Sequence, residues 1–146
     1  MGALMKPSRE CIALGALLGV LVSGRAWPCE CREFLPIDEA VKEYEFVFLA
    51  RAVGAEIENP WFDDPYLAVT IERIVPYKGG KPPFTILRTP AESSACGASV
   101  IVPEDQWFFT DAEGNFSKCS PTQSIHTQDG LYLLGKVRGE LLKRDD

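Results

Sequence analysis

The chain has 146 residues, with 15 Lys and Arg against 21 Asp and Glu and a formal net charge of −6 at pH 7. Without residues 1–26, which carry three of the basic residues and one of the acidic residues, the net charge is −8 over 120 residues. This length suits one domain with its own core, and an acidic surface without a basic stripe argues against a nucleic-acid partner.

The first 26 residues have the organisation of a secretory signal peptide. Lys6 and Arg9 form a basic start, residues 11–22 form an apolar run of twelve residues, and Gly24 and Ala26 supply small residues for cleavage. Twelve apolar residues are too few to span a bilayer as a helix. We therefore expect a protein without a membrane span that is secreted or extracellular, or periplasmic in a bacterium.

The cleavage site decides the first residue of the mature chain. Cleavage after Ala26 would make Trp27 the first residue, whereas cleavage before Cys29 would place Pro28 at the scissile bond, which signal peptidases handle poorly. We expect residues 1–26 to be removed and residues 27–146 to form a single domain.

Four cysteines remain after the leader, namely Cys29, Cys31, Cys96 and Cys119. An even number in an oxidising compartment predicts two disulfides, for which three connectivities are possible. A bridge between Cys29 and Cys31 would have poor geometry, so we expect the two bridges to run from this pair to Cys96 and Cys119. The alternative is a four-cysteine zinc site, although C-x-C is not the usual spacing of zinc knuckles.

Helical and extended patterns follow in chain order. Residues 36–44 begin with Pro and acids and have apolar residues on one helical face, which predicts a short helix. Segments rich in β-forming residues predict five strands, at residues 45–53, 66–75, 84–89, 106–110 and 116–119. Residues 130–144 carry a helical apolar face despite Gly135 and Gly139.

Five short strands with helices near both ends are typical of a small oligonucleotide/oligosaccharide-binding (OB) fold. The expected class is mainly β: a five-stranded OB-fold-like antiparallel barrel with flanking helices and two disulfides. Composition alone does not separate this barrel from a β-sandwich.

Several short motifs occur in the order seen in one known family. They are the C-x-C of residues 29–31, VFLARAV, the Tyr-Lys-Gly turn of residues 77–79, Ser94-Ala95-Cys96-Gly97, WFFTDAEGNF and Cys119-Ser120. From about residue 29 to residue 122, the chain resembles the inhibitory domain of tissue inhibitors of metalloproteinases (TIMPs) and the wider netrin-like (NTR) module.

This resemblance implies both a disulfide pairing and a binding edge. The gaps of 67 positions from Cys29 to Cys96 and of 88 positions from Cys31 to Cys119 are similar to those of the family's two bridges, so these pairs are the expected disulfides. The implied protease-binding edge consists of Cys29, Glu30, Cys31, Ser94, Ala95 and Cys96.

The resemblance also implies a mechanism. In such inhibitors the α-amine and carbonyl of the first Cys occupy the open position of a catalytic zinc and displace its water. Cys29 would therefore bind metal only in trans, to the zinc of a target protease, and only with a free amine. The implied partner is a zinc metalloprotease bound by a monomer, and no cofactor is expected.

Two features depart from the family pattern. Glu30 stands where the family usually carries a small uncharged residue such as Thr or Ser, and an unpaired carboxylate is costly to bury in an apolar pocket. A mature start at Trp27 would convert the amine of Cys29 into an amide, which does not chelate zinc. Removal of Trp27-Pro28 by an Xaa-Pro dipeptidyl peptidase would restore the amine.

The sequence offers little for catalysis, and we expect the protein not to be an enzyme. His126 is the single histidine, and Ser93-Ser94 lacks a Gly-x-Ser-x-Gly frame. Residues expected to have packing or solvated roles are Trp61, Phe62, Trp107, Phe108, Phe109, Asp63, Asp64, Asp145 and Asp146.

Two functions remain. The first is a secreted inhibitor that inserts the edge of residues 29–31, beside residues 94–96, into the cleft of a zinc metalloendopeptidase. The second is a non-inhibitory netrin-like extracellular module that binds a protein or a glycan through its barrel face or loops.

Overall fold

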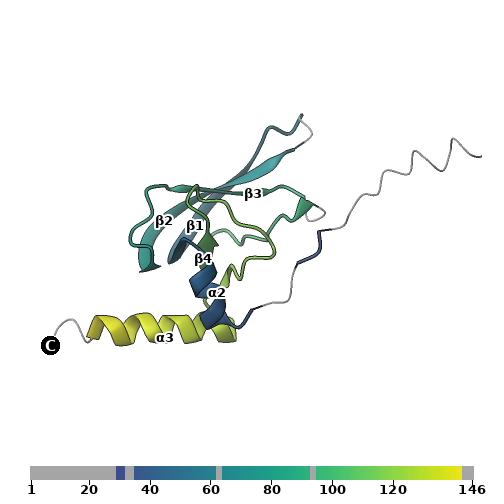
Figure 1. Cartoon of the computed structure of the whole chain (residues 1–146). Helices are drawn as coiled ribbons and strands as arrows, with labels where there is room; N and C mark the ends of the chain where they lie inside the picture. Colours follow the sequence, from purple (N-terminus) through teal and green to yellow (C-terminus); the bar gives the residue numbers. More distant parts are fainter. Residues whose placement is uncertain (1–28, 32–34, 62–63, 93–94, 143–146) are drawn as a thin grey trace, which may run out of the picture.

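The computed structural model describes residues 29–31, 35–61, 64–92 and 95–142 (Figure 1). The predicted leader and the residues around its cleavage site lie outside these ranges, as do Phe62, Asp63, Ser93, Ser94 and the last four residues. Within the described part, no helix is long and apolar enough to cross a membrane.

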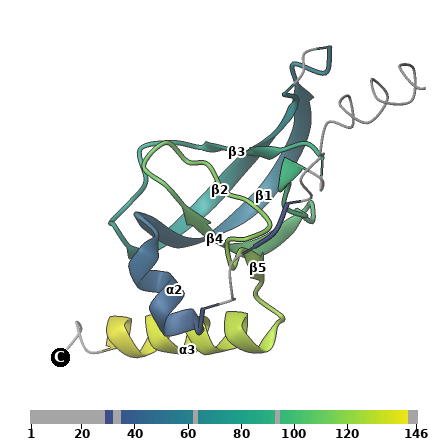
Figure 2. The same cartoon turned by 45° about the vertical axis from the view of Figure 1, so that its right-hand side comes forward.

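The described chain is mainly β, with five antiparallel strands in one sheet and two helices. In chain order the elements are α2 (Ile37–Glu43), β1 (Phe46–Glu58), β2 (Tyr66–Lys78), β3 (Ile86–Pro90), β4 (Glu104–Thr110), β5 (Gln123–Ser124) and α3 (Gln128–Leu142). The strand order in the sheet is β3-β2-β1-β4-β5. Both views show α2 and α3 together below the strands (Figures 1 and 2).

The structure confirms both predicted helices and the first four predicted strands, with shifted ends. The fifth predicted strand, residues 116–119, is wrong, because β5 is the two-residue segment Gln123–Ser124. In the predicted segment, Cys119 N–H donates to Ser117 Oγ (3.2 Å) and the Ser120 hydroxyl donates to the Ser117 carbonyl (2.6 Å). Such local side-chain bonds compete with a strand ladder and favour a turn.

The mainly β, five-stranded antiparallel arrangement agrees with the predicted fold class, and the sheet does not close into a barrel. The chain after β4 meets β3 at an isolated parallel bridge between Arg88 and Asn115. Two backbone hydrogen bonds support this bridge: Arg88 N–H donates to the Gly114 carbonyl (3.1 Å), and Phe116 N–H donates to the Arg88 carbonyl (2.9 Å). This contact remains an isolated bridge, and the chain turns at residues 118–119.

Two apolar clusters pack on opposite faces of the sheet. Strand β4 contributes to both, since successive side chains of a strand point to opposite faces. Phe108 joins the cluster that contains Phe48 and Phe116, and Trp107 and Phe109 join the cluster to which α3 contributes Leu133 and Val137. The side chains of Trp107, Phe108 and Phe109 are fully buried, as predicted.

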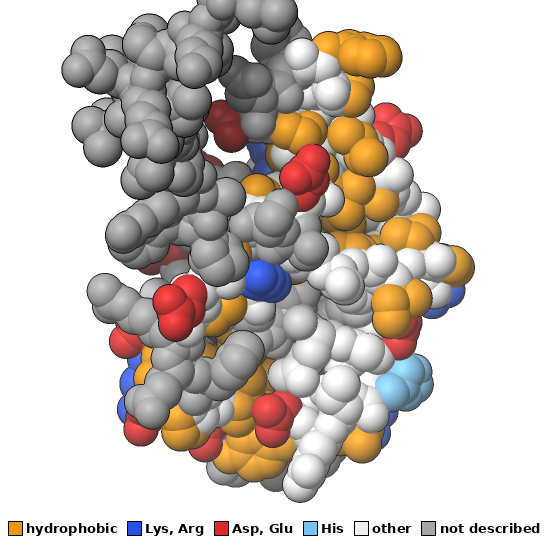
Figure 3. Space-filling view, turned by 90° about the vertical axis from the view of Figure 1, so that its right-hand side faces the viewer, with side chains coloured by type: hydrophobic (Ala, Val, Ile, Leu, Met, Phe, Trp, Pro, Cys, Tyr) orange, Lys and Arg blue, Asp and Glu red, His pale blue; other side chains and the backbone are white. Residues whose placement is uncertain are grey.

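The β1–β2 hairpin carries exposed apolar side chains near its tip. Trp61 is 93% exposed and Ile57 is 59% exposed, so Trp61 does not pack into the core or a loop as expected. On the face of the molecule that is drawn in Figure 3, apolar side chains gather at the upper right.

Specific hydrogen bonds attach the helices to the sheet. The Trp107 indole N–H donates to the Gly130 carbonyl (3.0 Å) in the first turn of α3, and Thr127 caps this helix by accepting from Gly130 N–H (3.0 Å). At the end of α2, Lys78 Nζ of β2 donates to the Lys42 carbonyl (2.7 Å) and to the Tyr44 carbonyl.

Candidate functional site

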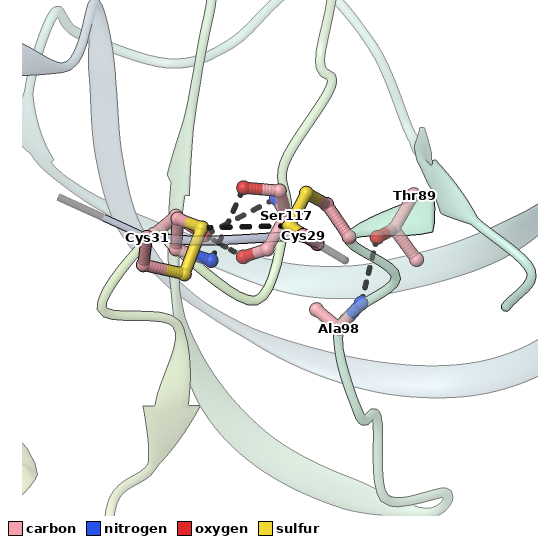
Figure 4. Close-up of a disulfide and its surroundings, with 8 residues drawn as sticks. Cys29, Cys31, Thr89, Ala98 and Ser117 are labelled. Carbon is pink, nitrogen blue, oxygen red and sulfur yellow. Dashed lines mark hydrogen bonds between the residues drawn. A yellow bond between two sulfur atoms is a disulfide. The ribbon is translucent and has the colours of Figure 1, made fainter. Parts of the chain in front are cut away.

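Two disulfides attach the first described residues to distant loops (Figure 4). Cys29 is bonded to Cys96 and Cys31 to Cys119, with a Cα–Cα distance of 5.2 Å in each bridge. This is the pairing that the resemblance implies. Because the two bridges start two residues apart, the backbone on both sides of Glu30 is held in place.

The loop that carries Cys96 is tightly folded. Cys96 has a φ of +71°, in the left-handed region that non-glycine residues seldom adopt. At Gly97 an added Cβ would meet the carbonyl oxygens of Pro90 and Glu92. The backbone N–H groups of Ala95 and Gly97 both donate to the Glu92 carbonyl, at 3.1 and 2.9 Å. The position of the Cys96 sulfur therefore depends on a glycine at residue 97.

Further hydrogen bonds join this loop to the sheet and to the second disulfide loop. Ala98 N–H donates to Thr89 Oγ1 of β3 at 2.9 Å (Figure 4). Lys118 N–H donates to the Cys96 carbonyl at 2.9 Å. The two loops that receive the disulfides from residues 29–31 are thus bonded to each other as well.

The loop that carries Cys119 contacts the end of α2. The Tyr44 hydroxyl donates to the Cys119 carbonyl at 3.5 Å. Partial burial, with a smaller contribution from the negative charge of Glu43, raises the pKa of Tyr44. The raised pKa favours the protonated phenol, which is the form that donates this hydrogen bond.

The described residues of the predicted edge lie close together and differ in exposure. Glu30 and Ala95 are exposed, whereas Cys29, Cys31 and Cys96 are half-buried. Ser94, the remaining predicted residue, lies outside the described residues. The edge therefore presents an exposed carboxylate at Glu30, with the small side chain of Ala95 next to a bridged cysteine.

Three of the four sulfurs form a compact group. Those of Cys29, Cys31 and Cys119 lie within 4.8 Å of one another, and Cys29 Sγ is 4.0 Å from Cys119 Sγ. Zinc is held by thiolates, whereas each of these sulfurs is bonded to another sulfur. The arrangement corresponds to the disulfide alternative and not to the four-cysteine zinc site.

His126 lies in a polar cluster at the surface. Its Nε2 is 3.9 Å from Glu104 Oε1, and its backbone N–H donates to Ser124 Oγ at 3.2 Å. The Ser124 hydroxyl donates to the Glu104 carboxylate. In a serine nucleophile the hydroxyl donates to its general base, commonly an imidazole, so these three residues do not have that geometry.

The structure also contains a cavity of about 450 Å³ beside the predicted edge. It lies between the start of β2, the end of β3 and the loop before Cys96, and Ala95 belongs both to its wall and to the edge. This cavity is not predictable from the sequence. No local pattern marks it, because the antiparallel register that places Tyr66 opposite Pro90 assembles its wall.

Comparisons with known proteins add no family assignment. No protein-family model matches the chain, and a search of curated proteins finds no matching sequence.

Proposed function

We propose that this chain is an exported TIMP-like inhibitor of zinc metalloendopeptidases that binds through the edge of residues 29–31 and 94–96. The observation that carries the proposal is the attachment of Cys29 and Cys31 to two separate loops, with the exposed Glu30 between them. A backbone segment that is ordered before binding lowers the entropic cost of entering a protease cleft.

The chemistry of the proposed inhibition depends on the chain start. A catalytic zinc in a protease has three protein ligands and a fourth position that is open to water. The α-amine and carbonyl of Cys29 would occupy that position and displace the water that attacks the substrate. An ordinary α-amine has a pKa of about 7.7–8.0, so a substantial fraction is neutral and can coordinate zinc at physiological pH.

Two forms of the exported domain test this mechanism. One form begins at Cys29, and the other carries a single Ala before Cys29. Against a panel of zinc metalloendopeptidases, we expect the form that begins at Cys29 to inhibit and the Ala-extended form to be weaker by at least about 100-fold. Thermal unfolding checks that the two forms are equally stable.

The outcomes separate the parts of the proposal. Equal inhibition by both forms would rule out coordination by the amine, and no inhibition of any protease by the Cys29 form would overturn the inhibitor function. Glu30→Ser, made in the Cys29 form, measures whether the carboxylate restricts the set of proteases. Mass spectrometry of the exported protein shows its natural start: a chain found only with Trp27 as first residue would contradict chelation.

A second candidate is a non-inhibitory extracellular module that binds a protein through the β1–β2 hairpin. The observation that favours it is the exposure of Trp61 (93%) and Ile57 (59%), because Trp is enriched among residues that dominate binding energy at interfaces. Failure of the Cys29 form to inhibit, together with loss of cell-surface binding by Trp61→Ala at unchanged stability, would favour this module.

A further inference from the structure

The cavity beside the edge has the size and lining of a small-molecule site. Its volume of about 450 Å³ falls within the range of roughly 300–1,000 Å³ that is common for such sites. Its apolar lining comes from Pro65, Pro90, the ring of Tyr66 and the ring of Phe116. A ligand with an apolar body of about the size of an aromatic ring would bury its surface there.

One side of the lining carries a cation held in place by its neighbours. The guanidinium of Arg88 lies over the ring of Tyr66, 5.5 Å from its centroid, and the Tyr66 hydroxyl donates to the Glu58 carboxylate. The ion pairs Arg51–Asp105, His126–Glu104 and Lys136–Asp38 of the described chain do not involve Arg88. Because Arg88 belongs to the cavity wall, a carboxylate on a ligand there would accept from its guanidinium.

The same cavity also carries negative charge. Asp64 and Glu92 contribute to its wall, and Asp64 is exposed and forms no ion pair within the described part of the chain. These carboxylates would repel a phosphate dianion and attract an ammonium group.

We propose that this cavity binds a free α-amino acid with an apolar side chain, with its carboxylate on Arg88, its ammonium group at Asp64 and its side chain against Tyr66 and Phe116. A zwitterion matches both charges of the lining, whereas a ligand of one charge meets repulsion from one of them. This site does not depend on protease inhibition.

Three related compounds test the proposal on the full exported chain. L-phenylalanine carries both charges, N-acetyl-L-phenylalanine carries only the carboxylate, and L-phenylalanine amide carries only the ammonium group. We expect L-phenylalanine to bind with a Kd of about 1 mM or tighter and each of the other two to bind at least about 10-fold more weakly. Isothermal titration measures affinity, and amide NMR shifts at Thr89, Ala95 and Phe116 locate the site.

Two variants assign the charges. Arg88→Gln should weaken the binding of L-phenylalanine and of N-acetyl-L-phenylalanine by about 10-fold and should not weaken that of the amide. Asp64→Asn should weaken the binding of L-phenylalanine and of the amide and should not weaken that of the N-acetyl compound. Arg138→Gln, at an exposed position of α3, should change none of them. Thermal unfolding of the three variants checks that their stability is unaltered.

Several outcomes would overturn the proposal. Absence of shifts at the cavity with all three compounds would show that it binds no such ligand. Equal affinity for the three would show that only the ring is recognised. Tighter binding of the N-acetyl compound would assign the cavity to the carboxyl end of a peptide, and tighter binding of the amide would assign it to the amino end.

Discussion

At the scale of single residues, two buried threonines differ in the hydrogen bonding of their hydroxyls. Thr110 is fully buried, and its Oγ1 has no partner in the described structure. Thr89 is equally buried, but its Oγ1 accepts from Ala98 N–H. Replacing the Thr110 hydroxyl by a methyl group therefore removes an unpaired polar atom, whereas the same change at Thr89 leaves a backbone donor without its acceptor.

We predict that Thr110→Val raises the free energy of unfolding by up to about 1 kcal/mol, and that Thr89→Val lowers it by about 1–2 kcal/mol. Urea denaturation of the two variants and the parent protein measures both values. The pair controls for the change from hydroxyl to methyl, since the substitution is identical. A loss of stability in Thr110→Val as large as that in Thr89→Val would show that Thr110 has a partner after all.

The candidate edge was only partly predictable at this scale. The motif Ser94-Ala95-Cys96-Gly97 was singled out by its resemblance to a family, and the structure supplies the physical reason for its glycine, which lies against two carbonyl oxygens. The left-handed backbone of Cys96 could not be predicted, because cysteine has no preference for it. The hydrogen bond from Lys118 N–H to the Cys96 carbonyl could not be predicted either, because it joins residues that are distant in sequence.

At the scale of secondary-structure elements, α3 contains glycines in opposite environments. Gly135 has open space where a Cβ would stand, so Gly135→Ala should raise stability by about 0.5–1 kcal/mol by reducing the freedom of the unfolded chain. At Gly130 a Cβ would meet the Ser124 carbonyl and lie 2.9 Å from Thr127 Oγ1. Gly130→Ala should therefore destabilise the protein, by about 1–3 kcal/mol.

Thermal unfolding of the two glycine variants measures these opposite effects within one helix. Equal changes of the same sign would show that helix propensity alone decides the outcome. Loss of the bond from Trp107 to the Gly130 carbonyl would appear in Gly130→Ala as a change in indole fluorescence, with no such change in Gly135→Ala.

A charged contact joins α2 to α3. Asp38 accepts hydrogen bonds from Lys136 Nζ and from the Tyr132 hydroxyl (2.9 Å). The bond from Lys136 is the largest cause that lowers the pKa of Asp38, and the bond to Asp38 raises the pKa of Lys136. Since the folded-state pKa of Asp38 is depressed, its contribution to stability is complete above the unfolded-state pKa and is lost as the pH falls through the folded-state value.

We predict that Asp38→Asn lowers the Tm slightly at pH 7, and that the difference from the parent protein disappears as the pH falls to about 2, below the carboxylate titration. The effect should be small because the pair is exposed to solvent. Glu39→Gln, an exposed change on the same helix, is the control. A difference in Tm that persists unchanged at low pH would contradict an electrostatic origin.

Elements with a strong local pattern were predicted well, and those fixed by distant contacts were not. The helix at Ile37–Glu43 and the long strands β1 and β2 follow from periodicity and β-propensity. The segment at residues 116–119 has a strand-like apolar start at Phe116, but the hydroxyls of Ser117 and Ser120 turn it. β5 has only two polar residues, which give no strand signal, and its position depends on pairing with β4.

At the scale of the whole molecule, the disulfides connect residues 29–31 to two separate loops of the fold. The bridge from Cys29 reaches the loop after β3, and the bridge from Cys31 reaches the loop before β5. Residue patterns did not decide which of Cys96 and Cys119 pairs with Cys29. Spacing alone does not exclude the crossed pairing, in which Cys29 would be bonded to Cys119 and Cys31 to Cys96. The two bridges enclose 67 and 88 positions of sequence, so each closes a long loop in the unfolded chain.

Removing either bridge should cost a similar amount of stability, because loop length enters the chain entropy only logarithmically. For separations of 67 and 88 residues, the entropic model gives about 4–5 kcal/mol for each bridge. We therefore predict that Cys29→Ala/Cys96→Ala and Cys31→Ala/Cys119→Ala lower the free energy of unfolding to nearly the same extent, as measured by urea denaturation under oxidising conditions.

The parent protein treated with reductant, which lacks both bridges, should be less stable than either variant. A difference between the two variants of more than about 2 kcal/mol would exceed the logarithmic effect of loop length and would show that native contacts of one bridged loop, rather than the restriction of the unfolded chain, determine its contribution.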